Sequence, residues 1–513
     1  MAKIAGIDLG TTFSAISHLN DMGHPEVIPN ADGERIMHSA VYFSENGKIQ
    51  VGTEAVHSRY EDTARSVRWI KFEMGNAEHR ASIDGSEHTP AELSALILKK
   101  LHQDAIPQVG EITDVVISIP ANFGEVARKA TMDAGKIAGL NVVGLVNEPT
   151  AAAFYYAITH EIAGRVMVFD LGGGTFDVSV ATVDGKDIDI VASSGDRDLG
   201  GSQFDKKLLE YFEKKYKEET GGKMYSTLEE KAEFEDYAER TKKSLSKKET
   251  VKFRLKGEEG TVSGEITRSE FESLISSDIA RIEMLIETVL DEAKVEASDV
   301  EKVLLAGGSS RIPAVQRLLN EMFGYEPTLA GNVDECVSLG AALYAGIRLL
   351  EESPDRVPEG ARGALEGLKV GEVCNASYGT TCMATDEVRG RDALKNDILI
   401  KKNSKIPCTV SRTYYTRYQG QDVINGNVTQ GESSDPDLVA DIAADNLELP
   451  AGLPQGSSID VTYSYDKDQR MSCVFEHKES RTKLVIDLDI ESGTSTSETI
   501  EDQQAKIEDL IID

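Results

Sequence analysis

The chain has 513 residues and carries 55 Lys and Arg against 88 Asp and Glu, which gives a formal net charge of -33. This length exceeds one compact core and predicts about three or four domain-sized units. The negative charge argues against a general affinity for nucleic acid or for anionic membranes.

The chain contains no run of about 18 apolar residues, and Met1 leads directly into an expected strand. We therefore expect a cytoplasmic protein that does not enter a membrane. The five cysteines are scattered and form no Cys-x-x-Cys pair, so we expect free thiols and neither disulfides nor a zinc site.

The first motif in the chain is Gly6-Ile-Asp-Leu-Gly-Thr-Thr-Phe-Ser14, and a second copy reads Asp170-Leu-Gly-Gly-Gly-Thr-Phe-Asp177. Apolar residues flank both copies, which predicts a strand on each side of a tight turn. Glycines allow such a turn and bring backbone N–H groups against an anion, and aspartates are suited to a hydrated Mg²⁺. Taken alone, the second copy leaves an ordinary Gly-rich hairpin with surface aspartates as an open alternative.

The repeated motif predicts two related lobes, each giving a hairpin to one ligand. In the first lobe the apolar strand Asp114–Ile119 meets Pro120, and a helix is expected over 125–138. In the second lobe the strand Lys302–Ala306 ends in Gly307-Gly-Ser-Ser-Arg311, and a helix is expected from Pro313. Each lobe also has a helix rich in small residues, at 147–153 and 338–342, where we expect two helices to cross closely.

The remaining segments are peripheral to this pattern. Residues 205–248 are helical and charged, 251–266 are β-like, and 268–293 read as one amphipathic helix. Prolines and glycines over 351–373 indicate a linker. Alternating apolar runs over 374–492 predict an antiparallel β-sandwich. A Ser/Thr-rich piece, 493–499, and a short helix, 500–512, follow.

At this point the chain resembles the seventy-kilodalton heat-shock chaperone family, the DnaK-type proteins. The resemblance is close over 1–347 and weaker beyond. It rests on Gly6–Ser14, Asn147–Ala153, Phe169–Val180, Asp198-Leu-Gly-Gly201 with Phe204-Asp205, and Gly307–Arg311.

The resemblance implies an α/β two-lobed actin-like ATPase domain with duplicated, ribonuclease H-like lobes, followed by an all-β sandwich that grips extended hydrophobic peptides of unfolded clients. The expected domains are 1–350, with lobe I at about 1–165 and lobe II at about 166–350, a linker at 351–373, the sandwich at 374–492 and a tail at 493–513. The implied function is that of an ATP-dependent molecular chaperone that hydrolyses ATP to ADP.

Asp8 and Asp170 would hold Mg²⁺ through water, and K⁺ is a further candidate ion. By the resemblance Lys71 reaches the γ-phosphate, and Glu148, Asp177 and Thr175 complete the catalytic set. Without the family, Lys71 would be read as a surface lysine. The residues expected to bind the nucleotide are Gly10, Thr11, Thr12, Phe13, Gly172, Gly173, Gly174, Thr175, Gly200, Gly201, Glu239, Lys242, Ser246, Gly307, Gly308, Ser309 and Arg311.

The resemblance also implies communication between domains through Pro120 and Arg128, and partnership with a J-domain cochaperone and a nucleotide exchange factor. Three departures bear on this expectation. The linker Gly367–Val373 lacks the usual acidic, leucine-rich sequence, Gly144 replaces an arginine used to engage J-domains, and only 500–512 remains of a helical lid. Peptide should therefore leave quickly. Ile424 is the candidate for the peptide pocket, although a shift of one residue would turn it outward.

Two other function classes stay open from the sequence. One is an actin-like ATPase or scaffold without regulated peptide binding. The other is a small-molecule kinase on the same fold, which would need an acceptor pocket and has no use for a C-terminal β-domain.

Overall fold

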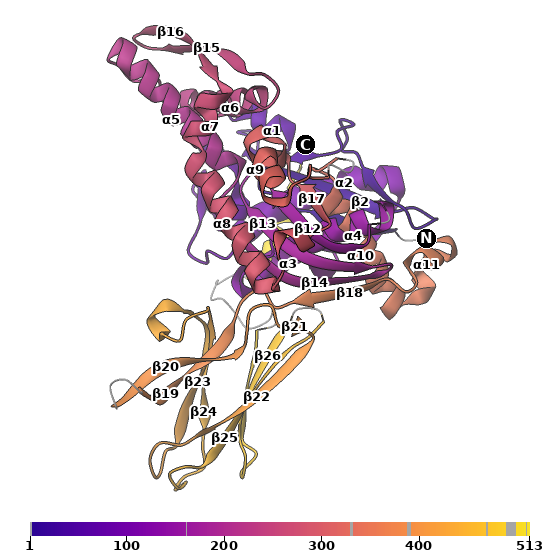
Figure 1. Cartoon of the computed structure of the whole chain (residues 1–513), viewed down its shortest axis with the longest axis vertical. Coiled ribbons are helices and arrows are strands. Elements are labelled where there is room, and N and C mark those ends of the chain that lie inside the picture. The colour runs from indigo at the N-terminus through magenta and orange to yellow at the C-terminus, as the bar shows by residue number, and fades with distance from the viewer. Residues whose placement is uncertain are drawn as a thin grey trace. The chain divides into compact units, whose positions relative to one another are not determined.

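The computed structural model describes residues 3–160, 162–328, 332–386, 391–467, 470–488, 499–508 and 510–512. The chain forms two compact units (Figure 1). Unit 1 contains Met1–Ala121, Ala130–Lys369 and Glu498–Asp513, and unit 2 contains Asn122–Lys129 and Val370–Ser497. Within the described residues no helix is both long and apolar enough to cross a membrane.

The first lobe of unit 1 is built on a sheet with the strand order β11-β10-β1-β2-β3, and β4 also pairs with β2. β1 is antiparallel to β2 and parallel to β10, which is parallel to β11. β10 is buried along nearly its whole length, as expected of a strand covered on both faces. The strands are β1 (Lys3–Asp8), β2 (Phe13–Leu19), β3 (Pro25–Ile28), β4 (Met37–His38), β10 (Ile112–Ile119) and β11 (Val142–Asn147).

The second lobe repeats this arrangement with the order β17-β12-β13-β14. β12 is antiparallel to β13 and parallel to β17. Asp170 pairs with Asp177 across the hairpin, as Asp8 pairs with Ala15 in the first lobe. The prediction of two related lobes is therefore confirmed. The strands are β12 (Gly164–Leu171), β13 (Phe176–Asp184), β14 (Asp187–Asp196) and β17 (Lys302–Ala306).

Two helices rich in small residues cross closely, as predicted. They are α4 (Glu148–His160) and α10 (Cys336–Glu352). A Cβ atom on Gly340 would lie 1.8 Å from the carbonyl oxygen of Ala151, so only glycine permits this approach. The other helices of the two lobes are α2 (Pro90–Val109), α3 (Glu125–Ile137), whose first turn belongs to unit 2, α9 (Pro313–Phe323) and the 3₁₀ turns η3 (Ala297–Asp299) and η4 (Gly308–Arg311).

A small subdomain inserted into the first lobe carries Lys71. Its three-stranded sheet has the order β6-β5-β7, and β7 leads directly into the turn that contains the lysine. The elements are β5 (Ala40–Phe43), β6 (Ile49–Val51), α1 (Thr53–Ser58), η1 (Thr63–Arg65), β7 (Ser66–Arg68), η2 (Ile70–Glu73), β8 (Ala81–Ile83) and β9 (Ser86–His88).

The charged helical region predicted at 205–248 is a subdomain of the second lobe, drawn at the top of Figure 1. The single helix predicted over 268–293 is wrong, because the helix breaks at Ile275, whose φ and ψ are -96° and 8°. The elements are α5 (Gly201–Thr220), α6 (Leu228–Leu245), the hairpin β15 (Thr250–Gly257) and β16 (Gly260–Thr267), α7 (Arg268–Leu274) and α8 (Ser276–Ala293).

The region predicted as a linker contains η5 (Pro354–Arg356) and α11 (Glu359–Leu365), both within unit 1. The Lys186 Nζ donates to the carbonyl oxygen of Glu366 at 2.6 Å, and the Lys369 backbone N–H donates to the Lys186 oxygen at 2.9 Å. These two hydrogen bonds therefore hold residues 366–369, the last before unit 2, to the β13–β14 turn.

The C-terminal helix α12 (Ile500–Glu508) is shorter than the predicted 500–512 and belongs to unit 1. The Lys506 Nζ donates to Glu92 of α2 at 3.0 Å, and the Ile49 N–H of β6 donates to the Ile511 oxygen at 3.0 Å. The end of the predicted sandwich and nearly all of the Ser/Thr-rich piece, 489–498, lie outside the described residues.

Unit 2 is a β-sandwich of two four-stranded sheets, β20-β19-β23-β24 and β22-β25-β26-β27. The alternating residues of β25 and β26 face the core between the sheets, as predicted. All five cysteines are free, also as predicted. The elements are β18 (Lys369–Val373), β19 (Tyr378–Asp386), β20 (Arg391–Ile400), β21 (Lys405–Ile406), β22 (Cys408–Tyr415), β23 (Val423–Gln430), η6 (Pro436–Leu438), β24 (Ala440–Glu448), β25 (Ser458–Tyr465), β26 (Met471–His477) and β27 (Lys483–Asp487). Together the units confirm the predicted fold class, an α/β two-lobed domain followed by an all-β sandwich.

Candidate nucleotide site

A cavity of about 1080 Å³ in unit 1 brings together most of the residues singled out in the sequence. A volume near 1000 Å³ is large enough for a ligand the size of a nucleotide. The predicted residues that line it are Asp8, Gly10, Thr11, Thr12, Phe13, Lys71, Glu148, Asp170, Gly172, Gly173, Thr175, Glu239, Lys242, Ser246, Gly307, Gly308, Ser309 and Arg311.

Four predicted residues, Gly174, Asp177, Gly200 and Gly201, are not among the lining residues. The glycines allow the backbone to pack behind the cavity wall. A Cβ atom on Gly200 would lie 2.8 Å from the Gly174 nitrogen, and one on Gly174 would lie 2.6 Å from the Thr11 Cγ2. Their contribution is close backbone packing that supports the two hairpin turns.

The two Asp-Leu-Gly hairpins meet at this cavity. A Cβ atom on Gly173 of the second hairpin would lie 2.0 Å from the Thr12 Oγ1 of the first. The first turn is fixed by Ser39, whose hydroxyl donates to the Gly10 oxygen at 2.7 Å. The hairpins therefore present their backbones side by side, as an anion-binding cradle requires.

Buried carboxylates surround a single lysine at the floor of the cavity. The Lys71 Nζ donates to Glu148 Oε1, and both side chains are buried. Burial opposes the charge of Lys71, but the carboxylates of Glu148 and Asp8 outweigh it and raise the pKa of the ammonium group. Lys71 therefore stays charged.

Burial, reinforced by the charge of Glu148, raises the pKa of Asp8 to about 7 and the pKa of Asp170 well above its usual value. The two carboxyl groups therefore tend to keep their protons until a further cation joins Lys71, and clustered hard oxygen donors of this kind are the ligands that Mg²⁺ prefers. Among the described residues no three His, Cys, Asp or Glu side chains converge as direct ligands. The donor set fits a hydrated ion held through water.

Asp177 does not line the cavity and lies opposite Asp170 in the β12–β13 hairpin. It is 1% exposed. Its charge helps to raise the pKa of Lys71, so it acts on the lysine electrostatically.

Helix α6 forms the other end of the cavity. Its Lys242 Nζ donates to Asp205 at 2.7 Å and to the Gly201 oxygen at 2.8 Å. Burial raises the pKa of Asp205 to about 6. The sequence placed Asp205 in a motif but did not identify it as the partner of Lys242.

Arg311 reaches the cavity from η4. Its guanidinium donates to Asp334 at 2.7 Å and to Asn332 at 2.9 Å. Asp334 also lines the cavity. No motif in the sequence marks Asp334, because it lies in a loop and pairs with Arg311 only through the fold.

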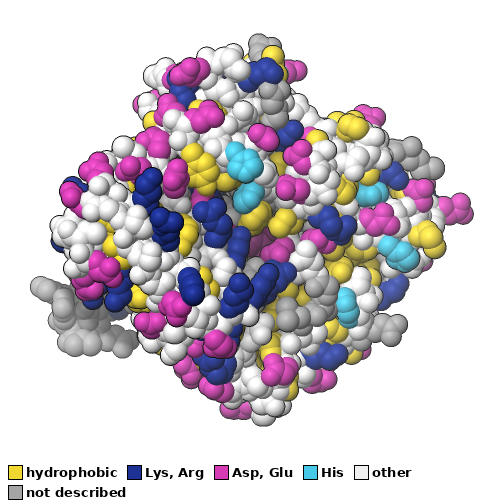
Figure 2. All heavy atoms as spheres, turned by 90° about the horizontal axis from the view of Figure 1, so that it is seen from above, with side chains coloured by type: hydrophobic (Ala, Val, Ile, Leu, Met, Phe, Trp, Pro, Cys, Tyr) yellow, Lys and Arg dark blue, Asp and Glu magenta, His cyan; other side chains and the backbone are white. Residues whose placement is uncertain are grey.

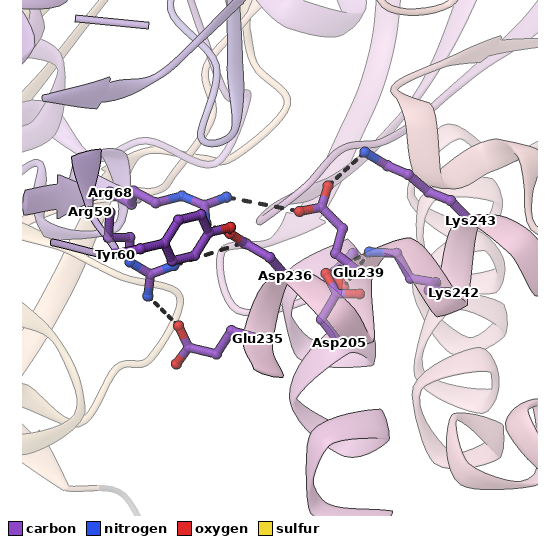
Figure 3. Close-up of polar contacts among 10 residues, drawn as sticks. Arg59, Tyr60, Arg68, Asp205, Glu235, Asp236, Glu239, Lys242 and Lys243 are labelled. Atoms are coloured by element: carbon purple, nitrogen blue, oxygen red, sulfur yellow. Dashed lines mark hydrogen bonds and ion pairs between the residues drawn. The ribbon is translucent and has the colours of Figure 1, made fainter. Parts of the chain in front are cut away.

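A further polar cluster, which the sequence did not reveal, joins α6 to the small subdomain of the first lobe (Figure 3). Arg59 pairs with Glu235, and the Tyr60 hydroxyl donates to Asp236. Arg68 donates to Asp236 at 2.7 Å. The only local signal is the helical spacing by which Glu235 and Asp236 each lie near Glu239, four and three residues further along α6.

The surface view agrees with a charged opening in unit 1. Figure 2 shows Lys and Arg side chains gathered around a hollow with acidic side chains deeper inside. Six lysines line the cavity: Lys71, Lys206, Lys231, Lys242, Lys243 and Lys247.

The predicted coupling and peptide residues lie away from this cavity. Pro120 is buried directly after β10, and Arg128 is buried on the first turns of α3, in the segment that belongs to unit 2. Ile424 of β23 pairs with the buried Leu447 and packs against the sandwich core. None of the three is among the residues that line the cavity.

Comparisons with known proteins agree with the site. A family model described as Hsp70 protein matches residues 4–84 and 73–510. The chain is 37% identical over 487 residues to the chaperone protein DnaK of Thermotoga neapolitana. The aligned region covers 91% of this chain and 76% of that protein. DnaK of Thermosipho melanesiensis is 36% identical over 484 residues, with the same coverage of 91% and 76%.

Proposed function

This chain belongs to the Hsp70 family, and from this premise we propose how its cavity hydrolyses ATP and regulates peptide binding. Hsp70 and DnaK chaperones are ATPases, and the chain is an ATP-dependent molecular chaperone. The kinase and scaffold alternatives are not favoured, since the family match continues through the β-sandwich to residue 510.

One observation carries the proposal for the site. The two duplicated hairpins, Lys71 and α6 all line a single cavity of about 1080 Å³. We assign the hairpins and Lys71 to the triphosphate, and Glu239, Lys242, Ser246 and Arg311 to the adenosine.

In the proposed reaction water attacks the γ-phosphate and ADP and phosphate leave. Phosphoryl transfer depends mainly on positioning and charge stabilisation. The backbone N–H group of Gly173 and the hydroxyl of Thr175 bind the transferred group, while the Gly172 N–H closes the turn by donating to the Thr175 oxygen at 3.0 Å. Lys71, kept charged by Glu148 and Asp177, holds the γ-phosphate and the attacking water in line.

Asp8 and Asp170 would hold Mg²⁺ through water, and the oxygen donors at the floor also suit a K⁺ ion. When bound, Mg²⁺ would supply positive charge to the phosphate oxygens. Ser118 fixes the orientation of Asp8 by donating to its Oδ1 at 2.9 Å.

For the whole chain we propose an ATPase domain over 1–350, a linker over 351–373, a peptide-binding sandwich over 374–492 and a tail over 493–513. Pro120 and Arg128 relay the nucleotide state, and Ile424 lines the peptide pocket. The clients are extended hydrophobic segments of unfolded polypeptides.

We also propose that a nucleotide exchange factor acts on the chain and that its J-domain partnership is weakened. Gly144 of β11 has open space where a side chain would project. A Gly144→Arg variant should therefore fold normally and respond more strongly to an added J-domain. Equal stimulation of phosphate release in both proteins would remove Gly144 from this role.

The function is tested by release of a fluorescent hydrophobic peptide with and without ATP. We expect ATP to speed release several-fold and Lys71→Met to bind ATP without hydrolysing it. ATP-independent release in a protein that hydrolyses ATP would eliminate regulated peptide binding.

Lys231→Met is the matched control for the lysine substitution. Lys231 also lines the cavity, but it is partly exposed and pairs with Glu235 at 3.7 Å, away from the floor. Its hydrolysis rate should stay close to that of the unsubstituted protein.

A further inference from the structure

The residue before the lysine turn has an unusual backbone. Trp69 stands between β7 and η2, the turn that carries Lys71, with φ 58° and ψ 25°. An aromatic residue in the left-handed region is uncommon and persists where its surroundings hold it there. The direction in which the chain enters the turn, and hence the place of Lys71, depends on Trp69 keeping this conformation.

Two guanidinium groups cover the ring of Trp69. Arg68 lies 4.7 Å and Arg59 lies 5.6 Å from the ring centre. Contacts of this kind are attractive and grow stronger when the cation is removed from water. The side chains of Arg68 and Arg59 are only 6% and 8% exposed, so both are largely desolvated.

The same guanidinium groups are held by α6 (Figure 3). Arg68 donates to Asp236 at 2.7 Å and lies 3.8 Å from Glu239, one of the residues assigned to the adenosine. Helix α6 thus fixes Arg68, and Arg68 covers Trp69. A continuous set of contacts runs from the adenosine end of the cavity to the phosphate end.

We propose that Arg68 and Trp69 are positioning residues for ATP hydrolysis, which set the place of Lys71 according to the position of α6. This inference rests on the proposed ATPase function. It adds that Asp236 and Glu239, at the nucleoside end of the site, fix the position of Lys71 at the phosphate end.

The test uses Arg68→Gln in the full chain. We expect its kcat for ATP hydrolysis to fall about tenfold while the Kd for ATP, measured by calorimetry, changes less than threefold. Trp69 is the only tryptophan of the chain, so its fluorescence reports the ring directly. Acrylamide should quench it more strongly in Arg68→Gln than in the unsubstituted protein.

Arg65→Gln is the matched control. Arg65 lies three residues away and pairs with Asp84 at 2.6 Å, within its own subdomain. It should leave kcat and the quenching of Trp69 unchanged. A merely structural role of Arg68 would instead lower thermal stability and ATP affinity together in Arg68→Gln.

Asp236→Asn weakens the contact between Arg68 and Asp236 from the side of α6, and it replaces Arg68→Gln in the test if that variant does not fold. It should reproduce the loss in kcat, and the double variant should be no slower than either single one. The inference is overturned if these variants keep kcat within twofold while the protein hydrolyses ATP. If the unsubstituted protein neither binds nor hydrolyses ATP, the proposed function itself fails and the inference falls with it.

Discussion

Replacing Lys71 by methionine should destabilise unit 1 and stop hydrolysis, because both depend on the positive charge of the lysine. Lys71 and Glu148 are each 5% exposed and form a hydrogen-bonded ion pair. Methionine fills similar space but leaves the carboxylate buried without its counter-charge. Breaking a buried pair in this way typically costs about 3–5 kcal/mol.

The measurement is urea unfolding followed by the fluorescence of Trp69, which lies in unit 1. We expect a loss of about 3–5 kcal/mol in Lys71→Met and recovery of most of it in Lys71→Met/Glu148→Gln, because the glutamine is uncharged. Lys231→Met, whose ion pair is partly exposed, should lose less than about 1 kcal/mol.

Single-turnover phosphate release with saturating ATP supplies the catalytic half of the prediction. Losing one fixed charge on the transferred group should slow the reaction at least about a hundredfold. The double variant should recover stability without recovering this rate. Undiminished hydrolysis in Lys71→Met, or a double variant as unstable as the single one, would refute the reasoning.

Three further predictions concern stability. Burial, together with the charge of Arg68, lowers the pKa of His38 to about 4, so the unfolded chain takes up a proton below about pH 6.5 before the folded protein does. The stability contributed by neutral His38 is present above pH 6.5 and is lost as the pH falls towards 4, with a loss of about 2 kcal/mol at pH 5. His38→Gln should therefore flatten the plot of urea-unfolding free energy against pH between pH 6.5 and 4. An unchanged plot would contradict the lowered pKa of His38. Gly340→Ala should cost about 3 kcal/mol in the same assay, because its Cβ would meet the Ala151 oxygen at 1.8 Å, while Gly363→Ala, with nothing within 4 Å, should cost nothing. Ile507 in α12 is 3% exposed, and Ile507→Ala should lower the free energy of unfolding of unit 1 by about 2 kcal/mol. An unchanged unfolding free energy would show that burying Ile507 does not stabilise unit 1.

Features with a local cause could be predicted from the sequence. The hairpins at Asp8 and Asp170 are marked by glycines that allow a tight turn, and their repetition predicted the duplicated lobes. The sandwich strands follow from alternation, because residues such as Tyr463 and Phe475 must all face one core.

Features that depend on tertiary contacts could not be predicted. The break at Ile275 occurs in a sequence with no glycine or proline nearby, and the fully buried isoleucine side chain is part of the core that decides it. The pairs of Arg68 with Asp236 and of Arg311 with Asp334 join segments far apart in the chain. Nothing in the sequence around either arginine identifies its partner.

The tail shows the same distinction between local and tertiary causes. The sequence correctly predicted a helix that begins at Ile500, because Thr499 accepts from the Asp502 N–H at 3.2 Å as an N-cap. It could not predict the surface on which the helix packs. The Lys99 Nζ donates to the Ile507 oxygen at 2.7 Å, and the Ile511 oxygen accepts from β6. The Lys99 contact satisfies one of the carbonyl groups that every helix leaves unpaired at its C-terminal end, and the Ile511 contact holds the chain just beyond the helix. Since their partners all lie in the first lobe, α12 acts in this structure as a stabilising element of unit 1.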